Sequence, residues 1–221
     1  MRPKLVALLV LVLLAIAIAV LETGGQSERS VAFDYYALVL SWSPTYCNIE
    51  GRDRHDRQCD RGSEPAFTLH GLWPQYAKGW PKDCPTERRP FVPRTVIDSM
   101  RDIMPSSSLV IHEYRTHGTC SGLDPTRYFA VARELYQRVT VPDAFKSQLA
   151  DLKLTPEEIE SDFLRANAWL KPDMISISCR KGQLLDIRVC FDRDLAPRAC
   201  GANEDQRRLC NLDHVSVPTA D

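Results

Sequence analysis

The segment IHEYRTHGTC at residues 111–120 combines two histidines, a glutamate and a cysteine in one short stretch. A zinc hydrolase of the H-E-x-x-H class needs its histidines one helical turn apart, so that both imidazoles share a face. His112 and His117 are five residues apart, which is about 140° around a helix of 3.6 residues per turn. A zinc hydrolase is therefore the least favoured class, and we expect no metal ligands and no cofactor.

Glu113 and His117 are four residues apart and would share one face of the same helix. A carboxylate beside an imidazole favours the charged ring and raises its pKa. The ordinary interpretation of such a pair is an ion pair on a surface helix. The alternative is a tuned acid–base group that works without a metal.

A second stretch, FTLHGLWPQY at residues 67–76, supplies another imidazole. His70 is predicted to end a strand just before Gly71, where the backbone can turn sharply. Histidine titrates near neutrality, so His70 and His117 together could supply both an acid and a base. Trp73 adds a flat surface on which a planar ring could stack. Taken singly, a histidine or tryptophan in an apolar strand is more often a core residue.

Together, FTLHGLWP and HEYRTHGTC closely resemble the two active-site signatures of the ribonuclease T2 family, in the same order and with a similar separation. Other segments are also similar to that family, and the resemblance covers about residues 33–210. They are ALVLSWSPTYC (37–47), GLWPQYAKGWPKDC (71–84) and ISISCRKGQLLDIRVCFDRDLAPRAC (175–200).

The resemblance implies a metal-independent endoribonuclease that cleaves single-stranded RNA through a 2′,3′-cyclic phosphate, with low base specificity. His117 would be the general base on the 2′-hydroxyl, and His70 the general acid on the 5′-oxygen. His112 would hold the scissile phosphate, and Glu113 would stabilise the charge that develops on it. DNA lacks the nucleophilic hydroxyl and would not be cleaved.

Three residues are candidates for contacting RNA. One of them follows the family pattern, and the other two depart from it. Trp73 would stack on a base. Gln75 stands where some members have a base-reading aspartate, and Thr116 stands where many have a lysine that would offer a full charge to the phosphate. Ser41 likewise replaces a frequent glutamine, so base preference is open. The missing lysine leaves a second hypothesis, a T2-fold RNA- or partner-binding effector with weakened catalysis, unless another cation compensates.

The chain divides into a leader, one domain and a tail. Its start, MRPK followed by an unbroken apolar run to Leu21, predicts a signal peptide over 1–21, with an uncleaved membrane anchor as the alternative. Residues 22–32 would be a flexible lead-in, 33–214 the catalytic domain and 215–221 a C-terminal tail. With 26% charged residues and a net charge of −1, any RNA must be held by a local cleft.

Eight cysteines in an exported chain predict up to four disulfides. Sequence alone allows about 105 pairings of eight cysteines. The family resemblance suggests Cys84–Cys120, Cys47–Cys59, Cys179–Cys210 and Cys190–Cys200. We expect a periplasmic or secreted protein, monomeric and detached from the membrane once the signal is removed.

The elements that must position these residues mix strands and helices without regular alternation. Apolar and β-branched runs predict strands at 31–42, 66–71, 173–179 and 183–191; helical signals cover 94–104, 124–139 and 155–170; 48–64 and 74–93 read as irregular. Asp124 and the Thr155/Glu158 capping box mark two helix starts. This pattern predicts an α+β fold, a central and mostly antiparallel sheet flanked by helices and stapled by disulfides. His55 and His214 read as solvated residues.

Overall fold

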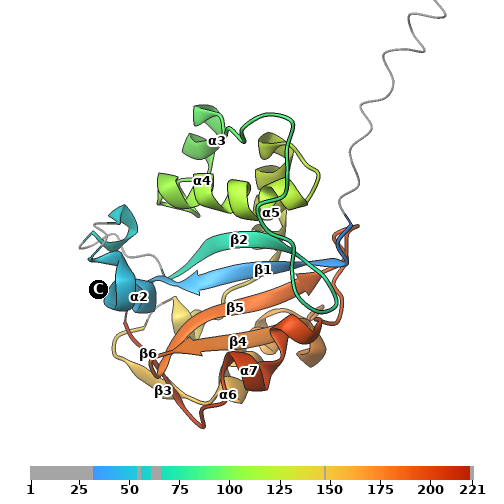
Figure 1. The fold of residues 1–221 in the computed structure, drawn as a ribbon. Coiled ribbons are helices and arrows are strands. Elements are labelled where there is room, and N and C mark those ends of the chain that lie inside the picture. Colours follow the sequence, from blue (N-terminus) through green and yellow to red (C-terminus); the bar gives the residue numbers. More distant parts are fainter. Residues whose placement is uncertain (1–31, 54–55, 61–65, 147, 220–221) are drawn as a thin grey trace, which may run out of the picture.

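The computed structural model describes residues 32–53, 56–60, 66–146 and 148–219 (Figure 1). The predicted signal peptide, nearly all of the lead-in and His55 lie outside these residues. Within the described part of the chain, no helix combines the length and the apolar character needed to cross a bilayer.

A six-stranded sheet forms the centre of the fold, in the order β2-β1-β5-β6-β3, with β4 also paired to β5. Its strands are β1 (Tyr35–Trp42), β2 (Phe67–Gln75), β3 (Leu152–Leu154), β4 (Ile175–Arg180), β5 (Gln183–Phe191) and β6 (Val215–Val217). Every pairing is antiparallel except the single bridge between β5 and β6. The predicted α+β class with a mostly antiparallel sheet is confirmed.

The two faces of the sheet differ in polarity, because side chains alternate along each strand. On β1, Leu38 and Trp42 are fully buried members of the hydrophobic core. The register places Ser41 opposite Thr68 of β2 and Asp186 of β5, so polar side chains share the other face. The sheet therefore packs its core on one face and offers polar groups on the second.

Two helices, α5 (Pro125–Arg138) and α6 (Pro156–Ala166), seal the apolar face, and the chain also forms α3 (Arg94–Ser99), α4 (Ser107–Thr116) and α7 (Gln206–Leu209). Tyr128 of α5 donates a hydrogen bond of 2.7 Å to the carbonyl of Leu72 in β2. Phe163 of α6 packs edge-on against Phe67 of β2, with 5.6 Å between ring centroids. Figure 1 shows α3, α4 and α5 gathered beside β2, whereas α6 and α7 lie near β4.

The helices largely follow the sequence signals, with shifted ends. They are α2 (Ser43–Tyr46), α3 (Arg94–Ser99), α4 (Ser107–Thr116), α5 (Pro125–Arg138), α6 (Pro156–Ala166) and α7 (Gln206–Leu209), with short turns η1 (Cys47–Gly51), η2 (Arg57–Cys59), η3 (Gly118–Cys120), η4 (Asp143–Phe145), η5 (Pro172–Met174) and η6 (Ala202–Glu204). Asp124 caps α5, and the capping box of Thr155 and Glu158 opens α6, as predicted. The predicted loop 48–64 was wrong at its start, where η1 continues α2.

Three predicted ends were wrong. Strand β2 does not stop at Gly71 but continues to Gln75, and it tolerates Pro74 because it is an edge strand. Helix α3 stops at Ser99, short of the predicted residue 104. The predicted tail contains β6, which pairs with β3, and the Pro218 carbonyl accepts a hydrogen bond of 3.0 Å from the Trp42 indole.

All four disulfides have the pairing that the family resemblance suggested. They join Cys47 to Cys59, Cys84 to Cys120, Cys179 to Cys210 and Cys190 to Cys200, and none of the eight cysteines is free. Cys84–Cys120 ties the irregular segment after β2 to η3, directly beyond His117. A backbone hydrogen bond of 2.8 Å from the Asp83 N–H to the Thr116 carbonyl reinforces the same junction.

Candidate active site

His70 reaches the site from a β-bulge. Leu69 pairs with Leu40 of β1 and Gly71 pairs with Val39, so His70 has no residue opposite it. An extra residue of this kind bends the strand and re-aims its side chain. The bulge turns the His70 imidazole toward a groove on the polar side of the sheet, where its side chain is 35% exposed.

Glu113 projects from α4 against the same strand. It is only 1% exposed, and a methyl group on Gly71 would overlap its Oε2 atom. The glycine is therefore required by the close approach of a carboxylate, and the sharp turn predicted at this position is absent. A larger residue at position 71 would force α4 and β2 apart or displace Glu113.

The carboxylate of Glu113 joins the two signatures. Its Oε1 lies 3.5 Å from His70 Nε2, and its Oε2 accepts a hydrogen bond of 2.7 Å from the Trp73 indole. The helical spacing had suggested His117 as its main partner. His117 is instead the C-cap of α4, where the chain leaves the helix, and the bulged His70 takes the position at the carboxylate.

The two imidazoles have oppositely shifted pKa values. Burial acts to lower the pKa of His70, but the hydrogen bond and charge of Glu113, aided by Asp186, outweigh it, and the pKa is raised. Burial also opposes ionisation of Glu113, yet His70, His117 and Trp73 hold the pKa of this carboxyl below its ordinary value. Both shifts favour the charged forms, so His70 and Glu113 are disposed to form an ion pair.

The pKa of His117 is lowered, first by burial and then by the positive charges of His70 and His112. Glu113 and Asp83 oppose this shift without reversing it. Glu113 does raise the pKa of His117, as predicted, but burial outweighs this contribution and the net shift is downward. The shifts favour the protonated form of His70 and the neutral form of His117, as an acid and a base would need.

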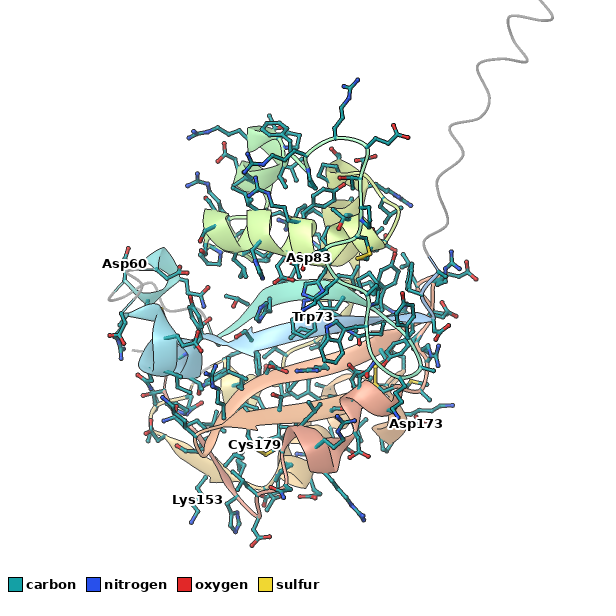
Figure 2. The ribbon with its side chains drawn as sticks, viewed as in Figure 1. Asp60, Trp73, Asp83, Lys153, Asp173 and Cys179 are labelled. Atoms are coloured by element: carbon teal, nitrogen blue, oxygen red, sulfur yellow. A yellow bond between two sulfur atoms is a disulfide. The ribbon has the colours of Figure 1, made fainter. Side chains whose placement is uncertain are left out.

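Trp73 packs among these groups, where the helical lobe formed by α3, α4 and α5 meets the strands (Figure 2). Its ring stacks on His117 at 5.0 Å between centroids, with 24° between planes, and meets His70 edge-on at 5.3 Å. The Arg188 guanidinium lies over it at 5.2 Å from the centroid. The indole therefore orients both histidines and Glu113, and its role as a base-stacking surface remains a prediction.

Arg188 is itself held by carboxylates. Its Nε lies 3.1 Å from Asp186, and its Nη1 lies 3.8 Å from the buried Glu204, which also accepts a hydrogen bond from the Tyr35 hydroxyl. Sequence reasoning missed these residues. Charged side chains at alternate positions of QLLDIRVCF, in an otherwise apolar strand, were the available signal.

A groove of about 630 Å³ opens beside His70 and His112. Its floor carries polar residues of the sheet, including Ser41, Thr68 and Asp186. One wall comes from the α2–η2 segment (Tyr46, Ile49, Glu50, Asp56 and Gln58) and another from the start of α4 (Ser106, Ser107, Ser108 and Leu109). Arg180 of β4 and Leu185 of β5 complete the lining. The groove is wide and polar enough for a nucleotide segment.

None of the three predicted contact residues, Trp73, Gln75 and Thr116, lines this groove. Gln75 is 2% exposed, and its Oε1 accepts a hydrogen bond of 2.9 Å from Asn203. Thr116 is half-buried at the end of α4, and its carbonyl binds the Asp83 N–H. Glu113 is buried and contacts the His70 imidazole. His117 contacts the rest of the site by stacking on the Trp73 ring. Among the described residues, no group of three or more His, Cys, Asp or Glu is arranged to hold a metal ion.

Comparisons with known proteins place the chain among ribonucleases. Residues 33–200 match the model of the Ribonuclease T2 family. A ribonuclease of Aeromonas hydrophila is 38% identical over 135 residues, covering 61% of this chain and 58% of that relative. Ribonuclease 3 of Arabidopsis thaliana is 34% identical over 184 residues, covering 72% and 79%. The RNase-related protein from Calystegia sepium has a similar fold, with a TM-score of 0.63 and 25% identity over 84% of this chain and 97% of that one.

Proposed function

Because the chain belongs to the ribonuclease T2 family, we propose that it is an endoribonuclease that cleaves single-stranded RNA through a 2′,3′-cyclic phosphate. One observation carries the proposal: two imidazoles with oppositely shifted pKa values lie around one buried carboxylate, and one of them, His70, lines the groove. The Aeromonas relative is longer than the segment matched here, so the activity of this chain rests on its own site.

In the proposed reaction, neutral His117 takes the proton of the 2′-hydroxyl, and the resulting oxygen attacks the adjacent phosphorus. The bond from phosphorus to the 5′-oxygen breaks, and protonated His70 donates its proton to that leaving oxygen. His112, exposed at the groove, holds the phosphate. Glu113 keeps His70 charged before each turnover. The products are a 2′,3′-cyclic phosphate and a free 5′-hydroxyl.

The shifted pKa values of the free protein predict a bell-shaped dependence of kcat/KM on pH. Activity rises with pH as His117 loses its proton, below the ordinary histidine value of about 6.5. It falls at higher pH as His70 loses its proton, above that value. Initial rates across the pH range would show both limbs, and Glu113→Gln should move the alkaline limb to lower pH. Glu157→Gln on the exposed side of α6 is the control. An alkaline limb unmoved in Glu113→Gln would contradict the assignment.

Chelation should not change the rate, because the proposed base and acid are both imidazoles. The direct test is digestion of the four homopolymer RNAs with and without EDTA, followed by identification of the product ends. We expect cyclic phosphates from all four polymers at comparable rates and no cleavage of DNA, which lacks the nucleophile. Loss of cleavage in EDTA with recovery in zinc would end the metal-free mechanism.

Thr116 supplies no charge to the phosphate, and this motivates the second candidate, an RNA- or partner-binding effector with weakened catalysis. Arg188 and His70 are paired with Asp186 and Glu113 and do not replace that charge, so the intact set of His70, His112, Glu113 and His117 is what favours the enzyme. The product-end assay separates the candidates, since an effector would bind RNA without forming cyclic ends.

We also propose that the protein is exported to the periplasm or secreted, and acts as a monomer released from the membrane. Four disulfides need an oxidising compartment, and the predicted signal peptide would take the chain there.

A further inference from the structure

A second groove, of about 310 Å³, runs along the outer side of α4. It is formed by the segment before α3, by α3 itself and by the side of α4 that carries Ile111 and Arg115. Its lining residues are Phe91, Val92, Arg94, Ile97, Asp98, Arg101, Ser107, Ile111 and Arg115. None of these residues belongs to the acid–base site.

This second groove is locally basic in a chain whose net charge is only −1. Three arginines line it against a single acidic residue, Asp98. Asp98 lies 3.6 Å from Arg94 and 2.8 Å from Arg101, but the Arg94 side chain remains 86% exposed and that of Arg101 43% exposed. Arg115 is also exposed, and its Nε contacts the Pro90 carbonyl at 3.4 Å. Figure 2 shows nitrogen-tipped side chains projecting from this lobe into solvent.

An aromatic ring stands beside these charges. Phe91 is 72% exposed, although Val92 next to it is buried in the core. Exposed aromatic rings next to cationic side chains are the combination that binds single-stranded nucleic acid without sequence preference, because every base has a flat face. Backbone phosphates are then paired by arginine.

The two grooves meet at the start of α4. Ser107 lines both of them, whereas His112 lines only the catalytic groove and Arg115 only the second. A strand that leaves the catalytic groove over Ser107 would therefore enter the basic groove without crossing another element. This continuity selects an extended strand over a compact ligand as the occupant.

We propose that the second groove binds the flanking nucleotides of long single-stranded RNA, with a base on Phe91 and phosphates on Arg94, Arg101 and Arg115. This inference rests on the proposed function. It assigns the groove to substrate affinity for polymers, not to the chemical step, so short and long substrates should respond differently to changes in it.

The test is the double variant Phe91→Ser/Arg94→Gln, which alters two exposed side chains. KM for a long single-stranded RNA should rise about fivefold or more, as for loss of one stacked base. The steepness of its salt dependence should fall by about 0.7 for the one lost phosphate contact. Cleavage of a dinucleoside monophosphate, too short to reach the groove, should keep its kcat/KM.

Leu149→Ser/Arg165→Gln is the matched control. Leu149 is 98% exposed, and Arg165 is an exposed arginine paired with Asp162 on α6. An unchanged KM for long RNA in the Phe91/Arg94 variant would overturn the proposal, as would an equal loss on both substrates. If the groove instead binds an acidic protein, the KM for long RNA should be unchanged in the Phe91/Arg94 variant.

Binding of an uncleavable 2′-O-methyl strand separates this proposal from the proposed function. Weaker binding by the Phe91/Arg94 variant supports the groove even if the wild-type chain cleaves nothing. Equal binding by variant and wild type counts against the groove even if dinucleotide cleavage is normal.

Discussion

His117→Ala is expected to lower kcat for RNA cleavage by about 10²–10⁴-fold, the usual contribution of one positioned acid–base group. The imidazole of His117, whose pKa is lowered by burial, is the proposed acceptor of the 2′-hydroxyl proton. His70→Ala should cost a similar factor. The double variant should be little worse than either, because acid and base act in one concerted transfer.

The roles of the two rings can be told apart with a nucleoside 3′-(4-nitrophenyl phosphate). Its leaving group departs without a proton, so His70→Ala should regain much of its activity on this substrate. His117→Ala should not, since the 2′-hydroxyl must still be deprotonated. The opposite pattern would exchange the two assignments.

Two controls guard against a structural explanation. His214→Ala removes an exposed histidine outside the groove and should leave kcat unchanged. Because His117 stacks on Trp73, His117→Asn keeps more of the packing and should show the same loss in kcat with a melting temperature closer to the wild type. More than a tenth of wild-type activity in both His117 variants would refute the proposed base.

Gly71→Ala is expected to lower kcat by about 100-fold, the scale of a 1 Å misplacement at an active site. The added methyl overlaps Oε2 of Glu113 and comes within 2.7 Å of the Trp73 indole nitrogen. Glu113 must then move away from His70, or α4 must move away from β2. Overpacking of this kind also costs about 1–3 kcal/mol of unfolding free energy, so the melting temperature should fall.

Whether displacement of Glu113 causes the loss of activity in Gly71→Ala can be checked from the pH–rate profile. Moving Glu113 removes the charge that raises the pKa of His70, so the alkaline limb of the pH–rate profile should shift to lower pH in Gly71→Ala. Adding Glu113→Asp shortens the displaced side chain and should restore part of the melting temperature. Wild-type activity with an unshifted profile would show that Gly71 does not hold Glu113 in place.

Local sequence patterns predicted the residue types of the site, but not how they meet. Gly71 suggested a turn that ends the strand, whereas the strand continues through a bulge at His70 that is invisible without the register of β1. Helical spacing paired Glu113 with His117, whereas the bulge brings His70 to that carboxylate from forty-three residues away in the chain. Both errors come from contacts between distant segments.

The fold was predicted well where signals are local and strong. The cap of α5, the capping box of α6 and the paired strands β4 and β5 all follow their sequence patterns. Strand β6 was missed because three residues, Val215–Val217, are too short for a periodic signal. Gln75 likewise accepts a hydrogen bond from Asn203, and no pattern in the residues around Gln75 predicts this distant partner.

The link between Cys84 and Cys120 has a consequence for the cell that makes this protein. It clamps the turn directly after His117, and it can form only after the thiols lose electrons. On the proposal that the protein is exported and that His117 is its base, a newly made chain in the reducing cytosol lacks that clamp, and His117 is held by one link fewer. The proposed enzyme would then be completed only after export, which would spare the cell's own transcripts during synthesis.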